Sequence, residues 1–499
     1  MNRATLSLLA AATALAAVTG FAVVTAPDGA GGPDAKGAPA TAAARQPVER
    51  SSLLCPAPST SDLAETTYSA FTPRNDAAPG RGGDAKPGKA QLFPAGGKAA
   101  DKPVVSLAGP GTPATVTASG AERPALVGTA DGALAPGWAA QQTTKVAAGT
   151  SRGVLGVSCT APDTAFWFPG ASTAATRQDY VHLTNPDDSA AVADVELYGP
   201  QGSLKSEAGQ NITVPPRSSV AVLLSTLSST RVTDATVHVR TRAGRVAAAV
   251  QAVEAKAGSD WLAASADPSG SVVLPGIPAD ATSVRLVVFA TGEDDADLKV
   301  RLAGANGSLT PAGAETLHVK SRMTSSLDLR DVTKGEAGSL VLTPSQGGRG
   351  APVVAAVRIV RGTKDKQEVA FVPATAAIGA RSTVADNRAQ GGVLSLVAPG
   401  AAGEVKVTAS AGSGGGAPVV KTYKVKAGTT QSLTAPVPTG LKGSYALTVE
   451  TVSGGPVHAA RMLQFPEDNV PMFTIQTLPD DRGTVVVPRA QSDLSVLDD

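Results

Sequence analysis

Short runs of alternating apolar and polar residues fill the chain from Cys159 onward. Such runs predict β-strands with one buried face, and Gly, Pro, Asn or Asp turns separate them. One run recurs almost unchanged, as DVELYGPQGSL from Asp194 and as KVRLAGANGSL from Lys299. The two copies lie about 105 residues apart, which is a domain-sized period. The chain therefore repeats a folded unit.

The same spacing extends to a third copy and to further strands. Valines that share a column of the repeat are Val195, Val300 and Val405 in one strand, Val214, Val319 and Val425 in the next, and Val246, Val353 and Val457 in a later one. A unit of about 105 residues with six or seven short strands is typical of an immunoglobulin-like sandwich. The pattern predicts an all-β chain of tandem immunoglobulin-like β-sandwiches.

Interruptions of the alternation predict the domain boundaries. We expect sandwich repeats over residues 159–268, 269–380 and 381–499, the last of them with C-terminal strands. Residues 51–158 predict a β-rich N-terminal region that contains a low-complexity loop at 74–103, where Gly, Ala, Lys and Pro dominate.

The first 26 residues place Arg3 before a long apolar stretch, which predicts an export segment. About 20 apolar residues can span a bilayer, so a cleaved signal peptide and a retained transmembrane anchor both stay open. The Ala, Gly and Pro of residues 27–50 indicate a disordered linker behind it. These features predict an extracytoplasmic protein, either secreted or anchored by one N-terminal segment in contact with the membrane.

The composition gives little support for a nucleic-acid partner and agrees with an all-β fold. The 499-residue chain has a formal net charge of +1, which gives no electrostatic reason to expect nucleic acid as a partner. Aromatic residues make up only 3%, so cores built from Val, Leu and Ala are expected.

Two cysteines occur, Cys55 in LLCPAP and Cys159 in VSCTAP. In an exported chain they are expected to form a disulfide, since the compartment is oxidising. The alternative is two buried free thiols.

Catalytic motifs do not emerge. The sequence has no H-E-x-x-H, phosphate loop or dinucleotide fingerprint. The histidines stand singly in different predicted strands, and the repeat does not align them: His182, His238, His318 and His458. We expect no catalytic residue and no cofactor.

Two other groups of residues suggest binding. Acidic residues gather in GEDDAD (Glu293 to Asp297) and in NPDDSAAVAD (Asp187 to Asp194), where Ca²⁺ is conceivable, but the third repeat lacks them, and solvated turns are the simpler interpretation. Trp167 and Trp261 could stack on sugars or could fill the ends of adjacent sandwiches. We expect no metal site and favour packing for the tryptophans.

The N-terminal apolar segment, the Ala/Gly/Pro stretch, CPAP at Cys55, WFPG at Trp167 and DWLAAS at Asp260 together resemble an exported actinobacterial family known only as a domain of unknown function. The resemblance implies export and brings no site residues. The leading hypothesis is a non-enzymatic envelope protein that acts as a scaffold, spacer or adhesion-type interaction protein, with another envelope protein as partner. A module that binds cell-wall or extracellular glycan is the alternative, and an enzyme with a site between domains is a third hypothesis.

Overall fold

The computed structural model describes residues 44–74, 87–96 and 102–487. The predicted export segment 1–26 and residues 27–43 of the predicted disordered linker 27–50 lie outside these residues. The prediction of a linker is wrong for its last part, because residues 44–47 form a strand and Arg50 begins another. Within the described ranges, no helix combines the length and apolar character needed to cross a membrane. The chain forms two units, Pro47–Val485 and a second made of Met1–Gln46 with Val486–Asp499. The described residues of the second unit belong to β1 (Ala44–Pro47) and β38 (Thr484–Val487), which pair in a two-stranded sheet.

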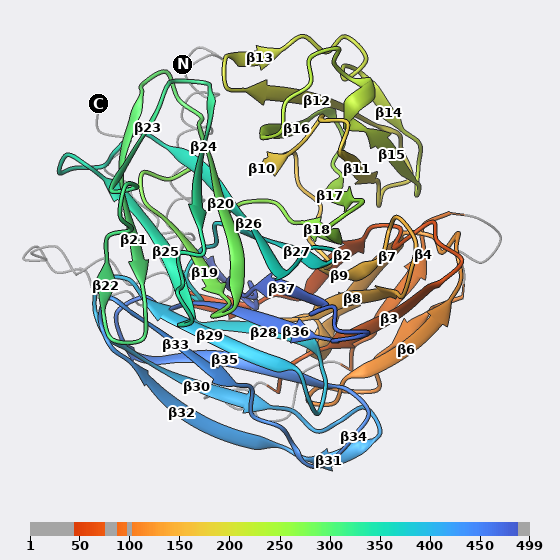
Figure 1. Ribbon diagram of the computed structural model, residues 1–499. Helices are drawn as coiled ribbons and strands as arrows, with labels where there is room; N and C mark the ends of the chain where they lie inside the picture. Colours follow the sequence, from red (N-terminus) through yellow and green to blue (C-terminus); the bar gives the residue numbers. More distant parts are fainter. Residues whose placement is uncertain (1–43, 75–86, 97–101, 488–499) are drawn as a thin grey trace, which may run out of the picture. The chain divides into compact units, whose positions relative to one another are not determined.

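The described part of the unit Pro47–Val485 contains four β-sandwiches (Figure 1). Sandwich 1 comprises β2 (Arg50–Cys55), β3 (Ala64–Phe71), β4 (Ala90–Pro94), β5 (Val105–Ser106), β6 (Ala114–Ser119), β7 (Leu126–Asp131), the 3₁₀ helix η1 (Gly132–Leu134), β8 (Ala139–Val146) and β9 (Gly153–Ser158). Sandwich 2 comprises β10 (Ala165–Ala171), β11 (Arg177–Thr184), β12 (Ala191–Gly199), β13 (Gly202–Leu204), β14 (Ile212–Val214), β15 (Ser219–Leu223), the 3₁₀ helix η2 (Leu224–Thr226), β16 (Ala235–Ala243), β17 (Ala247–Glu254) and β18 (Gly258–Leu262).

The other two sandwiches follow in chain order. Sandwich 3 comprises β19 (Val272–Ile277), β20 (Ala281–Ala290), β21 (Ala296–Ala303), β22 (Ser308–Leu309), β23 (Thr316–Val319), β24 (Thr324–Arg330), β25 (Gly338–Pro344), β26 (Val353–Thr363) and β27 (Lys366–Pro373). Sandwich 4 comprises β28 (Arg381–Asn387), β29 (Gly392–Ala398), β30 (Gly403–Ala409), β31 (Gly415–Ala417), β32 (Val419–Val425), β33 (Thr429–Thr434), β34 (Thr439–Lys442), β35 (Tyr445–Gly454), β36 (His458–Gln464) and β37 (Phe473–Thr477).

All four sandwiches share one strand order. When the short additional strands β13, β22, β31 and β34 are set aside, each sandwich has eight strands in two antiparallel sheets. One sheet has the order first-sixth-third-fourth, as in β2-β7-β4-β5, and the other has fifth-second-seventh-eighth, as in β6-β3-β8-β9. The predicted all-β fold class is confirmed.

The strand order differs in one respect from that of an immunoglobulin domain. There the first strand lies beside the second, in a sheet of order ABED. Here the first strand lies beside the sixth, as β10 does beside β16. The immunoglobulin-like description therefore stays a prediction.

Residues 51–158, which the sequence marked only as a β-rich region, form a complete copy of the repeated sandwich. The expected low-complexity loop at 74–103 is interrupted by β4 (Ala90–Pro94), the third strand of this copy. Leu92 at its centre has no exposed surface and packs in the core of sandwich 1. The prediction of one continuous loop is wrong because three inward-facing residues suffice for a short central strand; residues 75–86 and 97–101 lie outside the described ranges.

Alternation explains why the strands form where they do. In β21, Ala296, Leu298, Val300 and Leu302 are buried, whereas the residues between them, Asp297, Lys299 and Arg301, are exposed. This period of two places one face against the opposite sheet and the other in solvent. The column residues Val195, Val300 and Val405 all lie in third strands and are at most 1% exposed.

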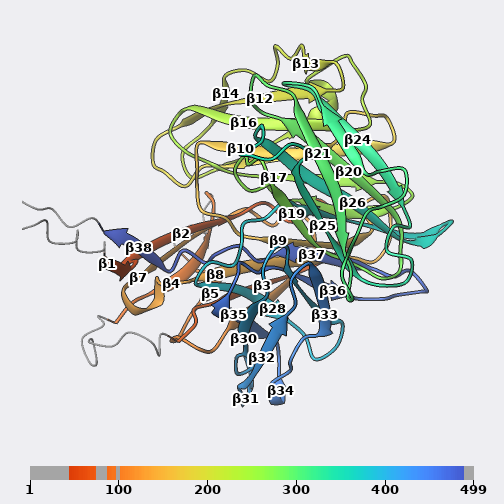
Figure 2. The ribbon, with the colours of Figure 1, turned by 90° about the vertical axis from the view of Figure 1, so that its left-hand side faces the viewer.

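The eighth strands of the four sandwiches meet at a common centre. In Figure 1 the labels β9, β18, β27 and β37 gather in the middle of the ribbon, and in Figure 2 β9 and β37 lie between sandwiches 2 and 3 above and sandwich 4 below. Shared apolar clusters join these strands in pairs. They unite β9 with β18 (Leu155, Trp261), β18 with β27 (Leu262, Phe371) and β27 with β37 (Val372, Ile475). The strands β37 and β9 also contact each other, and Met472, directly before β37, shares a cluster with Val154 of β9. Each eighth strand thus packs against two of the others, so that the four together form a closed circuit. We call these four strands, β9, β18, β27 and β37, the axial strands.

Candidate functional site

A buried carboxyl group lies at the centre of the axial strands. Asp260 in β18 is fully buried and accepts a hydrogen bond from the backbone N–H of Gly156 in β9 at 3.0 Å. The hydroxyl of Thr474 in β37 lies within hydrogen-bond distance of both Asp260 carboxyl oxygens, at 3.0 and 3.1 Å. One side chain therefore ties together sandwiches 1, 2 and 4.

Buried amides extend this network toward the other side of the centre. The Nε2 group of Gln476 donates to Thr474 Oγ1 at 2.7 Å, and that of Gln141 donates to Gln476 Oε1 at 3.0 Å. Gln141 Oε1 in turn accepts from the backbone N–H of Asp386 at 3.2 Å. We call the chain of residues from Asp260 through Thr474, Gln476 and Gln141 to Asp386 the axial network.

A second buried carboxyl group, Glu368, adds sandwich 3 to the centre. Its side chain has no exposed surface. Glu368 Oε1 accepts from the backbone N–H of Val154 at 3.1 Å, and the Nη2 atom of Arg152 lies 3.5 Å from Oε2. Arg152 also donates to the backbone carbonyl of Gln367. All four sandwiches therefore contribute polar atoms to the same centre.

The environment of these carboxyl groups favours their neutral forms. Burial raises the pKa of Glu368 to about 8, and Arg152 and the Val154 N–H only partly oppose it. Burial likewise raises the pKa of Asp260 well above its ordinary value, and the nearby Glu368 raises it further. Removing a carboxylate from water is costly unless hydrogen bonds and a close cation compensate. The neutral forms keep two acids close together without charge repulsion.

A glycine makes room for Glu368. Gly258 pairs with Glu254 in sandwich 2, and Glu368 pairs with Arg361 at the equivalent place in sandwich 3. A Cβ on Gly258 would lie 2.5 Å from Glu368 Oε2, and the φ of Gly258, +85°, is in the region that favours glycine. Gly258 and Glu368 thus occupy equivalent positions in two sandwiches. They differ because the two positions face each other at the centre, where the glycine leaves space for the glutamate side chain.

The two buried carboxyl groups lie away from the surface of the neighbouring cavity. A general acid or base must come within about 3 Å of the group that it protonates. The cavity near the carboxyl groups is lined by Arg152 and Gly258, and neither Asp260 nor Glu368 lines it. The two acids instead hold strands together.

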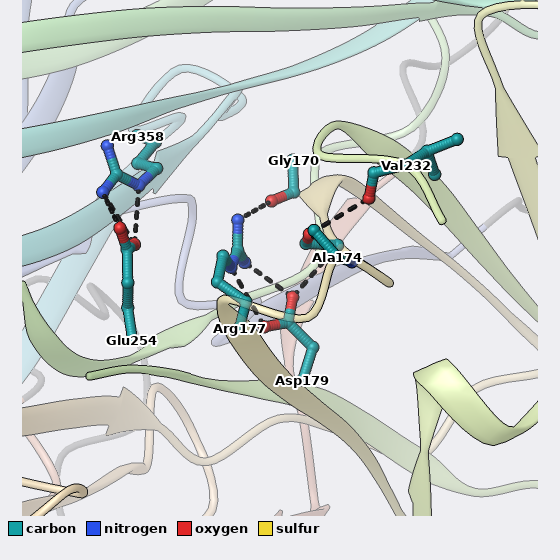
Figure 3. Close-up of polar contacts among 8 residues, drawn as sticks. Gly170, Ala174, Arg177, Asp179, Val232, Glu254 and Arg358 are labelled. Carbon is teal, nitrogen blue, oxygen red and sulfur yellow. Dashed lines mark hydrogen bonds and ion pairs between the residues drawn. The ribbon is translucent and has the colours of Figure 1, made fainter. Parts of the chain in front are cut away.

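Two ion pairs lie at the boundary of sandwiches 2 and 3, one buried and one partly buried (Figure 3). Arg177 donates to both oxygens of Asp179 at 3.1 and 2.6 Å and to the carbonyl of Gly170 at 3.1 Å. Its guanidinium also lies 5.2 Å from the ring centroid of Phe371 in sandwich 3. A second pair crosses the boundary itself: Arg358 of sandwich 3 forms two-pronged hydrogen bonds with Glu254 of sandwich 2, at 2.6 to 3.1 Å.

We expect Glu254 and Arg358 to be coupled by about 1.5–3 kcal/mol in a double-mutant cycle, because both side chains are mostly shielded from water. Glu254→Gln, Arg358→Met and the double variant would be unfolded in urea. The exposed pair Asp331 and Lys334 serves as a control and should couple by less than about 1 kcal/mol. Equal coupling in both cycles would contradict a stabilising role for the pair between Glu254 and Arg358.

The structure joins the two cysteines as the sequence analysis expected. Cys55 at the end of β2 and Cys159 just after β9 form a disulfide with their Cα atoms 4.5 Å apart. The bond links the first and eighth strands of sandwich 1, and both cysteines lie in its apolar core.

Both tryptophans singled out in the sequence pack between sandwiches. Trp261 is 2% exposed and shares an apolar cluster with Leu155 and Val157 of sandwich 1. Trp167 stacks on His238 at 3.7 Å between ring centroids and lies 5.3 Å from Phe289 of sandwich 3. The packing interpretation fits these contacts.

The four histidines lie in four different strands, β11, β16, β23 and β36. His238 contacts Glu196 at 2.9 Å and His318 contacts Asp297 at 2.8 Å. Burial is the largest cause of the lowered pKa of His182, about 4, and of the lowered pKa of His238. Within the ranges that the structure describes, no hydrogen bond joins an imidazole to a serine, threonine or cysteine side chain.

The acidic loops hold their carboxylates against arginine and histidine side chains. Asp187 pairs with Arg245 at 3.0 Å and Asp188 pairs with Arg217. In the second loop, Asp295 and Asp297 both approach His318, at 3.4 and 2.8 Å. The described residues contain no group of three or more potential metal ligands. These contacts favour the solvated-turn interpretation.

Sequence reasoning missed Asp260 and Glu368, which form the centre. One signal was available in the sequence. Asp260 and Glu368 each begin a run that is otherwise mostly apolar, DWLAAS and EVAFVPAT, and neither run shows the alternation that would put the acidic residue on a solvent-facing side. Only the packing of the eighth strands shows that the two acids converge.

Comparison with protein families identifies a match over much of the chain. A family model described as a family of unknown function, DUF5719, matches residues 114–436, more than half of the chain. The match begins in β6 of sandwich 1 and ends just after β33 of sandwich 4. No curated protein matches the chain.

Proposed function

Because the chain belongs to the DUF5719 family of unknown function, its role has to be argued from its geometry, and we propose that it is a non-enzymatic scaffold of the cell envelope. In this proposal the protein acts outside the cytoplasm, and its sandwiches present a fixed surface to another envelope protein.

The observation that carries the proposal is the closed circuit of axial strands. Four sandwiches joined by loops alone would rotate against one another, since small interfaces between domains normally permit motion. Here a buried polar network and apolar clusters involve all four. A protein of this construction keeps distant surface loops at constant separation, which suits a platform better than an extended spacer.

Two further observations agree with this role. The Cys55–Cys159 disulfide suits an oxidising compartment outside the cytoplasm. In the described part of the chain, the histidine–carboxylate contacts have no hydroxyl or thiol nucleophile joined to the imidazole, which weighs against an acyl-transfer enzyme.

Glycan binding is the less favoured alternative. Carbohydrate recognition through Trp167 or Trp261 would need an exposed aromatic face, and both rings are packed between sandwiches.

Co-sedimentation of the purified full chain with isolated cell walls tests the proposal. We expect saturable binding to intact walls and its loss after the walls are stripped of protein, because the partner is a protein. Binding that survives stripping would support the glycan alternative instead. If neither preparation binds the chain, the scaffold proposal is wrong in this form; heat-unfolded chain controls for non-specific adsorption.

A further inference from the structure

A cavity of about 330 Å³ opens where the hairpins between seventh and eighth strands come together. Each sandwich contributes to its wall: sandwich 1 through residues 147–150 and Arg152, sandwich 2 through Ala255 and Gly258, sandwich 3 through Lys366, and sandwich 4 through Glu467 and Asp468. Small-molecule sites occupy about 300–1,000 Å³, so this volume suits a small ligand.

Some charged side chains in the cavity wall have an oppositely charged partner among the described residues, and others do not. Glu467 is paired with Lys145 at 2.5 Å. Neither Lys366 nor Asp468 forms an ion pair with any described residue. Arg152 has only the carboxyl group of Glu368, 3.5 Å away, as an acidic neighbour among the described residues. The wall thus offers two cations, one directly before β9 and one in β27, and one carboxylate, from the turn between β36 and β37.

The rest of the wall narrows the class of ligand. Small residues form much of the lining, among them Ala147, Ala148, Gly149 and Ala255, and the described lining residues include no aromatic ring. A stacked sugar or base would find no stacking partner there. A compact ligand with opposite charges at its two ends would meet a partner for each.

We propose that this cavity binds a short peptide with free termini, its carboxylate at Arg152 and Lys366 and its ammonium group at Asp468. The inference goes beyond the scaffold role and does not depend on it, because the cavity is defined by the hairpins alone. Binding of a simple anion would not depend on Asp468, and binding of a simple cation would not depend on Lys366. Binding of the peptide depends on both residues.

Four dipeptide probes separate these possibilities when titrated calorimetrically into the full chain: Ala-Ala with free termini, its N-acetyl form, its C-terminal amide, and the doubly blocked form. We expect Ala-Ala to bind at least about tenfold more tightly than any blocked form, because each charge-assisted contact is worth roughly that factor. Equal binding of all four probes, or no binding of Ala-Ala, would overturn the proposal.

Two variants assign the ends. Lys366→Gln should weaken binding of Ala-Ala about tenfold while leaving the amide form unchanged, and Asp468→Asn should remove the preference for a free amino group. Both positions are exposed, so the fold should tolerate the changes. Lys421→Gln, on the exposed face of β32, is the matched control. Variants that bind Ala-Ala as the unmodified chain does would place the ligand elsewhere and refute the assignment.

Discussion

Loss of the Cys55–Cys159 disulfide is expected to lower the free energy of unfolding by about 4–5 kcal/mol. The bond closes a loop whose ends are 104 residues apart in sequence, and chain-entropy models give roughly this value for a loop of that length. It also joins the first and eighth strands of sandwich 1, so reduction frees the end of an axial strand. The measurement is urea unfolding of the Cys55→Ser, Cys159→Ser double variant beside the unmodified chain.

Reducing agent provides the control for this experiment. It should destabilise the unmodified chain to the level of the double variant and leave the variant itself unchanged. A loss below about 1 kcal/mol would show that packing alone fixes the two strands and that the entropic argument fails for this loop.

Glu368→Gln is expected to make the protein more stable at pH 8 and to flatten the dependence of stability on pH. The pKa of Glu368 is raised from 4.5 to about 8 in the folded chain. A raised pKa means that the folded state prefers the proton, so this stabilisation is complete below about pH 4.5 and is lost as the pH rises through 8. The loss amounts to about 5 kcal/mol, at about 1.36 kcal/mol per pH unit.

The glutamine side chain introduced by Glu368→Gln cannot ionise, and its amide oxygen can still accept from the Val154 N–H. Urea unfolding at about pH 5, 6.5 and 8, which spans the window between the unfolded and folded pKa values, should therefore give curves that diverge as the pH rises, with the variant more stable at the highest pH. The pKa of Asp260 is also raised, so the stability of both proteins still depends on pH. The quantity to compare is therefore the difference in unfolding free energy between the variant and the unmodified chain at each pH. Glu207→Gln, at an exposed position, is the control and should run parallel to the unmodified chain. Parallel curves for Glu368→Gln as well would contradict ionisation at this site.

Alternation predicted the strands well where one face is buried and the other solvated. Val195, Val300 and Val405 could be aligned because each sits in a third strand with that pattern, and the repeat then gave three of the four sandwiches. Sandwich 1 was missed because its third strand has five residues and its fourth, β5, has two, too few for the period to be visible.

The centre could not be predicted from the same pattern. Asp260 and Thr474 are 214 residues apart, and their contact depends on how separate sandwiches dock. Docking follows from the shapes of finished interfaces, whereas alternation reports only which face of a strand is buried. The cysteine pair was different, because in a chain with two cysteines each thiol has only one possible partner within the chain.

The axial network also constrains the order in which the chain can finish folding. Sandwich 2 contains Asp260, but the hydroxyl that Asp260 needs belongs to Thr474, near the end of sandwich 4. During synthesis from the N terminus, sandwiches 1 to 3 are complete while this carboxyl still lacks its partner. The eighth strand of sandwich 4 is synthesised last, so a chain that stopped before Phe473 would lack the hydroxyl that contacts Asp260.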